Sequence, residues 1–161
     1  MVRMAVWRDG ETWRRLRDGT GCPTCQRGRP LGVVGESPST WITTEERVAC
    51  LGYACVVSKR HVVEPFELSA DEQVAFFADV TAVARAVDEL FHPTKLNYEI
   101  HGNTIPHLHL HLFPRYVGDP FEGGPIRGGE QHALHSSGGI ERMTAAFAAA
   151  LANDRSASRQ G

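Results

Sequence analysis

Residues 107–112 of this 161-residue chain read His-Leu-His-Leu-His-Leu, an uninterrupted alternation of imidazole and apolar side chains. Side chains on a β-strand point to opposite faces in turn. The alternation therefore predicts a strand with three histidines on one face and three leucines entering a core on the other. An ordinary polar strand face would carry Thr, Lys, Glu and Ser. A face of imidazoles instead suits metal ligation, or proton and nucleophile chemistry near neutral pH.

A long helix is the clearest element upstream of this strand. Ser69 and Glu72 form a capping box, with Ser69 as the N-cap and Glu72 at the third helical position. His92-Pro93 ends the helix. Between these signals, residues at helical spacing predict its buried face, which consists of Val74, Phe77, Thr81, Ala84, Val87 and Phe91.

Strands are expected on both sides of that helix. The expected strands are 31–35, 39–44, 53–57, 95–100 and 105–113, and the last two form a hairpin that turns at 101–103. Helices are expected at 11–17 and, as a last amphipathic helix, around Ile140, Met143, Phe147 and Leu151. Strands that flank one long helix without β–α alternation indicate an α+β fold. The expectation is an antiparallel sheet of about five strands, with the long helix packed on it and a C-terminal helix.

The length suits a single domain whose core needs no disulfide support. Residues 1–152 are expected to form that domain, and residues 153–161 a disordered tail. Residues 118–139 are rich in Gly, Pro and His and are predicted to be a mobile loop or a lid. His132 and His135, which lie in this segment, are expected to be solvated.

Charge and cysteine content restrict the partners and the compartment. Seventeen basic and nineteen acidic residues leave a net charge of −2, so charge implies neither a nucleic-acid nor a membrane partner. No apolar run approaches the ~18–20 residues that span a bilayer, and no segment resembles a signal peptide. A cytoplasmic location is therefore expected. In a reducing cytosol the four cysteines are expected to be thiols or metal ligands.

Cys22-Pro-Thr-Cys25 has the two-residue spacing of a zinc-chelating pair or of a redox pair, and a vacant, reduced pair is the remaining alternative. A redox pair usually begins a helix beside a strand, whereas this pair follows a glycine-rich turn. Two thiolates leave a tetrahedral zinc site incomplete, so a zinc site requires two further ligands. Cys50 and Cys55 are expected to be buried small hydrophobic residues.

The residues around the alternation resemble the histidine triad (HIT) family of nucleotide hydrolases and transferases. The family signature is three histidines alternating with apolar residues and followed by two apolar positions, and residues 107–113 match it throughout. The flanks at 102–106 and 114–115 agree as well, except that Asn103 stands where many members carry Gln. The likeness extends back to about Thr40. It implies the HIT fold, a half-barrel-like sheet with a long helix on one side, and in many members a homodimer.

The resemblance also implies roles for individual residues. The middle histidine of the family carries the nucleotidyl group, which corresponds to His109, and His111 would hold the phosphate. Neutral imidazole suits this chemistry, because its free pKa lies near 6.5 and water can attack the phosphoramidate it forms. Substrate contacts are expected from phosphate donors at Asn103 and Thr104, an acid for the ribose at Glu45, a phosphate contact at Arg115, and pocket-lining side chains at Asn97 and His101.

A structural zinc ion is implied by the same resemblance. Some bacterial members, and the related hexose-1-phosphate uridylyltransferases, hold zinc on a Cys-x-x-Cys pair, a histidine after the central strand and the first triad histidine. Those positions correspond to Cys22, Cys25, His61 and His107. Such a site is closed and would anchor the N-terminal segment behind the triad. No organic cofactor is expected.

The leading hypothesis is a hydrolase that cleaves a dinucleoside polyphosphate or a nucleoside phosphoramidate at the α-phosphorus, through a nucleotidyl-His109 intermediate. Its expected partners are a small-molecule nucleotide and a second copy of the chain in a homodimer. The alternatives are a nucleotidyltransferase with the same intermediate, a non-catalytic nucleotide-binding protein stabilised by zinc, and a metalloenzyme whose catalytic metal sits on the histidine face.

Overall fold

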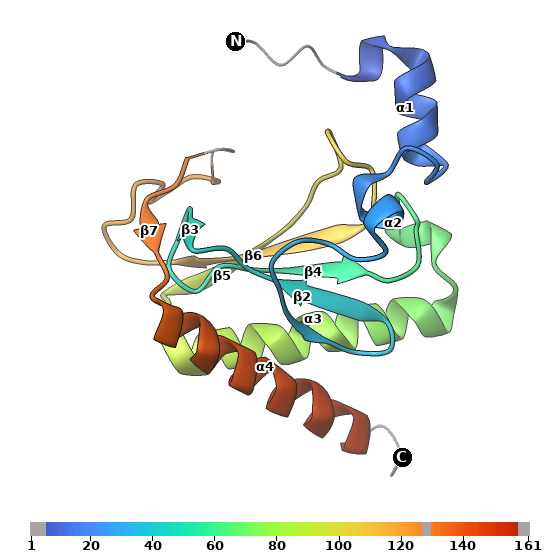
Figure 1. Ribbon diagram of the computed structural model, residues 1–161. Coiled ribbons are helices and arrows are strands. Elements are labelled where there is room, and N and C mark those ends of the chain that lie inside the picture. The colour runs from blue at the N-terminus through green and yellow to red at the C-terminus, as the bar shows by residue number, and fades with distance from the viewer. Residues whose placement is uncertain (1–5, 127–129, 158–161) are drawn as a thin grey trace.

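The computed structural model of the chain describes residues 6–126 and 130–157. Its main sheet has five antiparallel strands in the spatial order β1-β2-β4-β6-β5 (Figure 1). These strands are β1 (Val33–Glu36), β2 (Thr40–Thr43), β4 (Ala54–Ser58), β5 (Lys95–Ile100) and β6 (His109–Arg115). A second sheet pairs β3 (Arg47–Val48) with β7 (Ala133–Leu134). The predicted α+β class with a five-stranded antiparallel sheet is confirmed.

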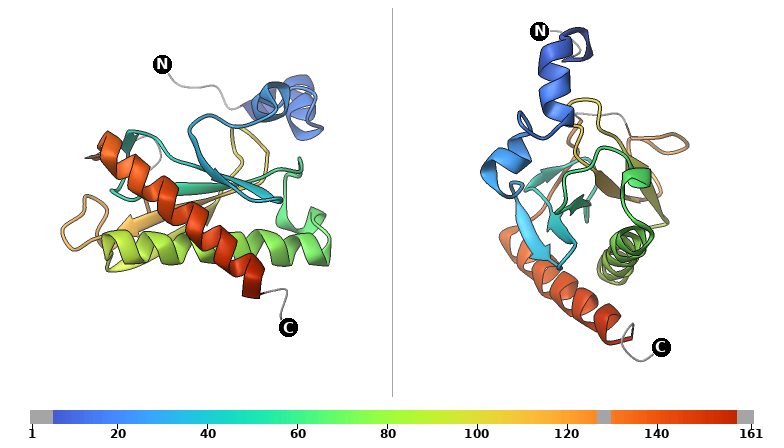
Figure 2. Two further views of the ribbon diagram at one scale, coloured as in Figure 1. Left: turned by 60° about the horizontal axis from the view of Figure 1, so that its bottom comes forward. Right: turned by 90° about the vertical axis from the view of Figure 1, so that its right-hand side faces the viewer.

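Two long helices cover one face of the main sheet. α3 (Ala70–Phe91) contacts β4 and β6, and α4 (Ser137–Ala157) contacts β1 and α3. The capping box at Ser69 and Glu72 is present at the start of α3 as predicted. Figure 2 shows both helices on the same side of the sheet, so the core lies between them and the strands.

The N-terminal segment lies on the other side of the sheet (Figures 1 and 2). It contains the 3-10 helix η1 (Val6–Arg8) and the helices α1 (Gly10–Arg17) and α2 (Pro23–Arg27), and a further 3-10 helix, η2 (Pro65–Glu67), precedes α3. No helix in residues 6–126 and 130–157 has both the length and the apolar character needed to cross a membrane.

The register of the sheet separates a core face from a polar face. Val56 of β4 pairs with Ile42 of β2 and with Leu110 of β6, and all three are buried in the core beneath α3 and α4. The alternate residue pairs of β4 and β6 are His109 with Val57 and His111 with Cys55. The side chains of these pairs point to the opposite face of the sheet. The leucines of the alternation therefore enter the core as predicted.

The buried face of α3 is rotated from the predicted one. Phe76, Val80 and Val83 are buried, together with Ala84 and Val87 of the predicted face. In contrast, the N-terminal part of the prediction was wrong, because Val74 is 71% exposed, Phe77 is 42% exposed and Thr81 is exposed.

Asp79 explains this rotation. Its buried carboxylate accepts hydrogen bonds from the hydroxyls of Ser37 (2.5 Å) and Thr40 (2.8 Å), which lie at the turn between β1 and β2. Asp79 must therefore face the sheet, and Phe76 and Val83 lie on the same side of the helix at spacings of three and four residues. Apolar spacing alone could not reveal this orientation, because the residue that fixes it is an acid.

The connection between β5 and β6 is longer than the predicted tight turn. β6 begins at His109 rather than at Ile105, so residues 101–108 form the connection and His107 lies before the strand. The backbone N–H of Leu108 donates to the carbonyl oxygen of Val62 (2.7 Å), which holds the end of this connection against the segment after β4.

The C-terminal third also differs from expectation. β7 lies inside residues 118–139, which were predicted to be a loop or a lid, and residues 127–129 lie outside the described part. α4 continues to Ala157, so residues 153–157 are helical rather than part of the expected disordered tail. The rest of that tail, residues 158–161, lies outside the described residues.

His135 is buried rather than solvated, with only 3% of its surface exposed. Its Nδ1 donates to the carbonyl oxygen of Glu45 (2.8 Å), and its Nε2 accepts from the backbone N–H of Gly52 (2.8 Å). One imidazole therefore ties the two ends of residues 45–52 to the segment that leads into α4. His132 is exposed, in agreement with the expectation.

Phe76→Ala and Phe77→Ala test the buried face of α3 with the same change at adjacent positions. Phe76→Ala should lower the free energy of unfolding by about 3–5 kcal/mol, because it leaves a cavity in the core. Phe77→Ala should lower it by about 1 kcal/mol or less, because that ring already contacts solvent. Denaturant titration followed by circular dichroism measures both values. A larger loss for Phe77→Ala than for Phe76→Ala would contradict this orientation of the helix.

Candidate functional site

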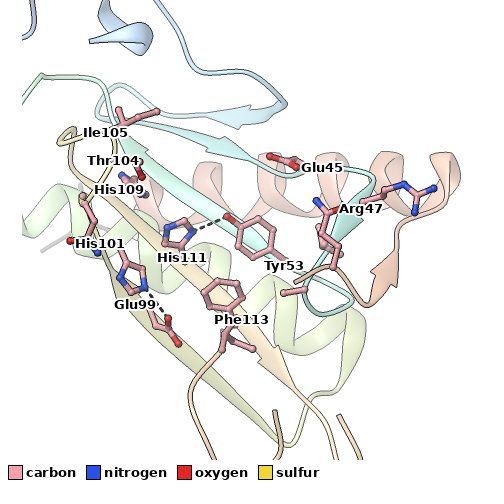
Figure 3. Close-up of a pocket in the computed structure, with 16 residues that line it drawn as sticks. Glu45, Arg47, Tyr53, Glu99, His101, Thr104, Ile105, His109, His111 and Phe113 are labelled. Carbon is pink, nitrogen blue, oxygen red and sulfur yellow. Dashed lines mark hydrogen bonds and ion pairs between the residues drawn. The ribbon is translucent and has the colours of Figure 1, made fainter. Parts of the chain in front are cut away.

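A cavity of about 570 Å³ opens on the face of the sheet opposite α3 and α4 (Figure 3). Its wall comes from β5 and β6, the connection between them, Tyr53 just before β4, and the segment around β3. Six of the predicted site residues line this pocket, namely Glu45, His101, Asn103, Thr104, His109 and His111. The fold thus brings together residues that are up to 66 positions apart in the sequence.

His109 is held in one tautomer by the backbone. Its Nδ1 lies 2.6 Å from the carbonyl oxygen of His107. A carbonyl oxygen can only accept a hydrogen bond, so Nδ1 carries the ring proton and Nε2 retains its lone pair. Burial also lowers the pKa of His109, which favours the neutral ring. His109 therefore has the protonation state that a nitrogen nucleophile needs.

His111 is fixed by an aromatic stack and a hydroxyl group. Its ring packs beside those of Tyr53 and Phe113, with centroid distances of 5.9 Å and 5.5 Å, and the Tyr53 hydroxyl lies 2.8 Å from its Nδ1 (Figure 3). Burial lowers the pKa of His111 to about 3 and raises the pKa of Tyr53, so both groups are neutral near pH 7. A phenol that donates to Nδ1 leaves the ring proton on Nε2, the form that can donate to a phosphate oxygen.

Tyr53 was missed by the sequence reasoning, which treated it as part of an apolar strand. The signal that could have found it is the register of the sheet. Ala54 pairs with Leu112, so the preceding Tyr53 lies beside Phe113 on the face that carries His111. This register follows from the pairing of β4 with β6, which the sequence alone does not specify.

Asn97 and Arg115 are not brought to this pocket. Both line a separate cavity at the other end of β5 and β6. The Arg115 guanidinium is nearly buried and donates to both carboxylate oxygens of Asp119 (2.8 and 2.9 Å) and to the carbonyl oxygen of Gly124 (2.7 Å). Its donors are therefore used within the fold, where they hold the turn after β6.

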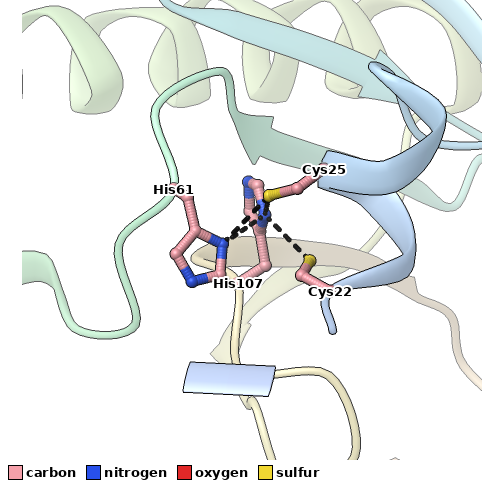
Figure 4. A group of neighbouring side chains, drawn as sticks. All are labelled: Cys22, Cys25, His61 and His107. Carbon is pink, nitrogen blue, oxygen red and sulfur yellow. Dashed lines mark hydrogen bonds between the residues drawn. The ribbon is translucent and has the colours of Figure 1, made fainter. Parts of the chain in front are cut away.

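The first triad histidine does not share the pocket with the other two, in contrast to the predicted common face. The ring of His107 is buried and lies instead beside Cys22, Cys25 and His61 (Figure 4). Its Nδ1 is 3.5 Å from the Cys22 sulfur and 3.1 Å from His61 Nδ1, and the Cys25 sulfur is 3.2 Å from His61 Nδ1. All four ligand atoms lie within 4.8 Å of one another, so the four residues form a group that can hold a metal ion.

The donor set of this cluster fits a metal with tetrahedral sulfur and nitrogen ligands. The Nε2 of His107 lies 2.7 Å from the carbonyl oxygen of Ser58, and the Nε2 of His61 lies 2.9 Å from that of Arg17. Both Nε2 atoms therefore carry the ring proton, and both Nδ1 atoms keep a lone pair directed at the sulfurs. Such backbone contacts are the usual way in which metal-binding histidines are oriented.

The cysteine pair lies at the start of a helix, which the sequence reasoning did not expect. Cys22 is the N-cap of α2, Pro23 follows at the first helical position, and Gly28 ends the helix with a positive φ of 75°. All four cysteines are free thiols, and Cys50 and Cys55 are buried as expected. Two histidine nitrogens beside the pair favour metal binding over a redox role.

Comparison with known proteins matches the part of the chain that carries His61 and the three triad histidines. A family model described as HIT domain matches residues 27–118. "Protein hit" of Bacillus subtilis is 29% identical over 103 residues, which cover 55% of this chain and 71% of that protein. Bis(5'-nucleosyl)-tetraphosphatase (asymmetrical) of Schizosaccharomyces pombe is 29% identical over 73 residues, which cover 42% of this chain and only 40% of that protein.

Among solved structures, the crystal structure of a zinc-bound histidine triad family protein from Mycobacterium smegmatis is similar to this chain. The TM-score is 0.56 at 26% sequence identity, and the match covers 86% of this chain and 98% of that chain.

The low pKa of His111 gives a prediction for the pH dependence of stability. The ring should not titrate between pH 8 and pH 5, whereas in the unfolded chain it titrates near the free value of about 6.5. Below that value the unfolded state takes up a proton that the folded state does not, so this residue lowers the free energy of unfolding as the pH falls from about 6.5 towards 3. NMR of the ring protons, repeated in denaturant, measures both titrations. A folded-state midpoint near 6.5 would contradict the burial of this ring.

Proposed function

The chain belongs to the HIT domain family, and on that premise we propose that it is a nucleotide hydrolase that cleaves its substrate at the α-phosphorus through a nucleotidyl-His109 intermediate. The observation that carries the proposal is the 2.6 Å hydrogen bond from His109 Nδ1 to the carbonyl oxygen of His107. This bond leaves Nε2 as the nucleophilic atom of a neutral, partly buried ring in the pocket wall.

The proposed reaction has two chemical steps. His109 Nε2 attacks the α-phosphorus, a nitrogen–phosphorus bond forms and the leaving group departs with its electron pair. His111, fixed by Tyr53, donates to a non-bridging oxygen, and Asn103 and Thr104 at the rim supply further donors. Water then attacks the phosphorus, the nitrogen–phosphorus bond breaks, and the electron pair returns to Nε2.

Two of the alternatives are less well supported by the geometry. A catalytic metal on the face of the triad would draw on its three imidazoles, but His107 points into the cysteine cluster and leaves only two triad histidines, His109 and His111, in the pocket. A non-catalytic binding protein would have no need for a buried histidine held as its nucleophilic tautomer. A transferase differs from a hydrolase only in the acceptor, and the similarity to a tetraphosphatase of Schizosaccharomyces pombe favours water.

Zinc is the metal that we propose for the cluster of Cys22, Cys25, His61 and His107. Two thiolates and two imidazoles make a closed tetrahedral set, which is typical of structural zinc. The similarity to a zinc-bound protein of Mycobacterium smegmatis supports this choice. Bound there, the ion would join the N-terminal segment to the start of β6, and its contribution would be to stability rather than to the chemical step.

His109→Ala tests the covalent mechanism. It should lower kcat/KM by about 10³-fold or more, because no other group on this strand face has a free Nε2 lone pair directed into the pocket. Binding of a nucleoside monophosphate should remain within a few-fold. Mass spectrometry after rapid alkaline denaturation should detect one nucleotidyl group on wild-type His109 and none on the variant. If the variant keeps a tenth of the wild-type rate, the mechanism is wrong.

The paired change Cys22→Ser with Cys25→Ser tests the zinc site. Protein purified without chelators should contain about one zinc per chain, and the variant should contain almost none. Loss of metal bound only by the folded state should lower the Tm and expose the first ~25 residues to proteases. Cys50→Ala, a buried cysteine outside the cluster, is the control and should keep its zinc. Far less than one zinc in the wild-type protein would rule the site out.

A further inference from the structure

An imidazole–carboxylate pair faces the pocket from the end of β5. Glu99 lies directly opposite His111 in the register of β5 and β6, so its side chain is on the pocket face. His101 follows two residues later, and its Nε2 is 3.0 Å from the Glu99 carboxylate (Figure 3). The ring centroids of His101 and His111 are 5.6 Å apart. His101, just after β5, and Tyr53, just before β4, thus both lie beside His111.

The contact with Glu99 uses only one of the two ring nitrogens of His101. The carboxylate can only accept, so Nε2–H of His101 donates to it and Nδ1 is the nitrogen left for exchange of a proton. The Glu99 side chain is only 18% exposed, whereas that of His101 is 50% exposed. The largely buried Glu99 carboxylate therefore orients the His101 imidazole. That imidazole reaches the open side of the pocket, where the leaving group would meet solvent.

No other pocket histidine can deliver a proton to that group. The Nδ1 proton of His109 is held by the carbonyl oxygen of His107, and its Nε2 becomes bonded to phosphorus. Burial, followed by charges on His109 and His101, lowers the pKa of His111 to about 3, so that ring holds no extra proton near pH 7. A leaving group that does not depart as an anion needs a proton donor. Neither His109 nor His111 supplies that proton.

We propose that His101, positioned by Glu99, donates a proton from Nδ1 to the leaving group of the nucleotide and then takes a proton from the attacking water. This inference rests on the proposed nucleotidyl-His109 mechanism. In the first step the bond from phosphorus to the leaving oxygen or nitrogen breaks, and that atom takes the Nδ1 proton of the His101 imidazolium. In the second step water bonds to phosphorus, its proton passes to Nδ1 of the neutral ring, and His109 leaves.

The consequence is a dependence on leaving-group basicity. An alkylamine or an alcohol cannot leave phosphorus easily without a proton, whereas p-nitrophenolate can. His101→Gln should therefore lower kcat/KM for an AMP alkylphosphoramidate by about 10²-fold, the effect expected for loss of a general acid. For the p-nitrophenyl ester of AMP, the rate of the burst of p-nitrophenolate released in the first step should change by less than about threefold. Glu99→Gln should also lower kcat/KM for the phosphoramidate and spare the p-nitrophenyl ester, but the loss should be smaller than for His101→Gln.

A matched control comes from another part of the chain. His132 and Glu130 form a pair with the same two-residue spacing and the same 3.0 Å contact, but neither residue lines the pocket. His132→Gln should leave the rates with both substrates unchanged. Circular dichroism and Tm of all three variants distinguish a local effect from loss of the fold.

The outcomes separate this inference from the mechanism on which it rests. An equal loss for both substrates, or no loss for the phosphoramidate, would overturn the role of His101 while nucleotidyl-His109 still forms. Failure of the wild-type protein to form that adduct with the p-nitrophenyl ester would overturn the proposed function itself, and the assignment of His101 with it.

Discussion

His107 is the residue on which the two parts of the site depend. Its backbone carbonyl oxygen accepts the Nδ1 proton of His109, and its ring donates from Nε2 to Ser58 and presents Nδ1 to the cysteine cluster. A single position therefore fixes the tautomer of the pocket histidine on one side and belongs to the metal-binding group on the other. The N-terminal segment, the end of β4 and the start of β6 meet at this residue.

The register of the sheet places the site residues on one face, where they line the pocket. Rows of paired residues alternate between the two faces, so Leu110 and Leu112 enter the core while His109 and His111 remain on the opposite face. The same register sets Glu99 beside His111, and Tyr53 beside Phe113. A shift of one residue in the pairing of β4 or β5 with β6 would exchange these two faces, and the hydrophobic core makes such a shift costly.

Much of this arrangement could be predicted from the sequence, because strong local patterns carry it. The alternation at 107–112 fixed the faces of β6, and the family signature pointed to the cluster of Cys22, Cys25, His61 and His107, whose ligand atoms lie together in the structure. Three of the differences from the prediction have a common cause. Asp79, Arg115 and His135 are polar side chains buried through partners far along the chain or on a turn. Their hydrogen bonds exist only in the folded protein, so hydrophobic spacing and composition do not report them.

The bonds of His135 have a consequence for the dynamics of the pocket. Residues 45–52 supply part of the pocket wall, and this imidazole joins both ends of that segment to the chain just before α4. Opening of the C-terminal helix would release the wall while the five-stranded sheet stayed paired. Hydrogen exchange in residues 45–52 should accordingly follow the sub-global opening of α4, so the ligand-facing wall and the C-terminal helix would behave as one cooperative unit.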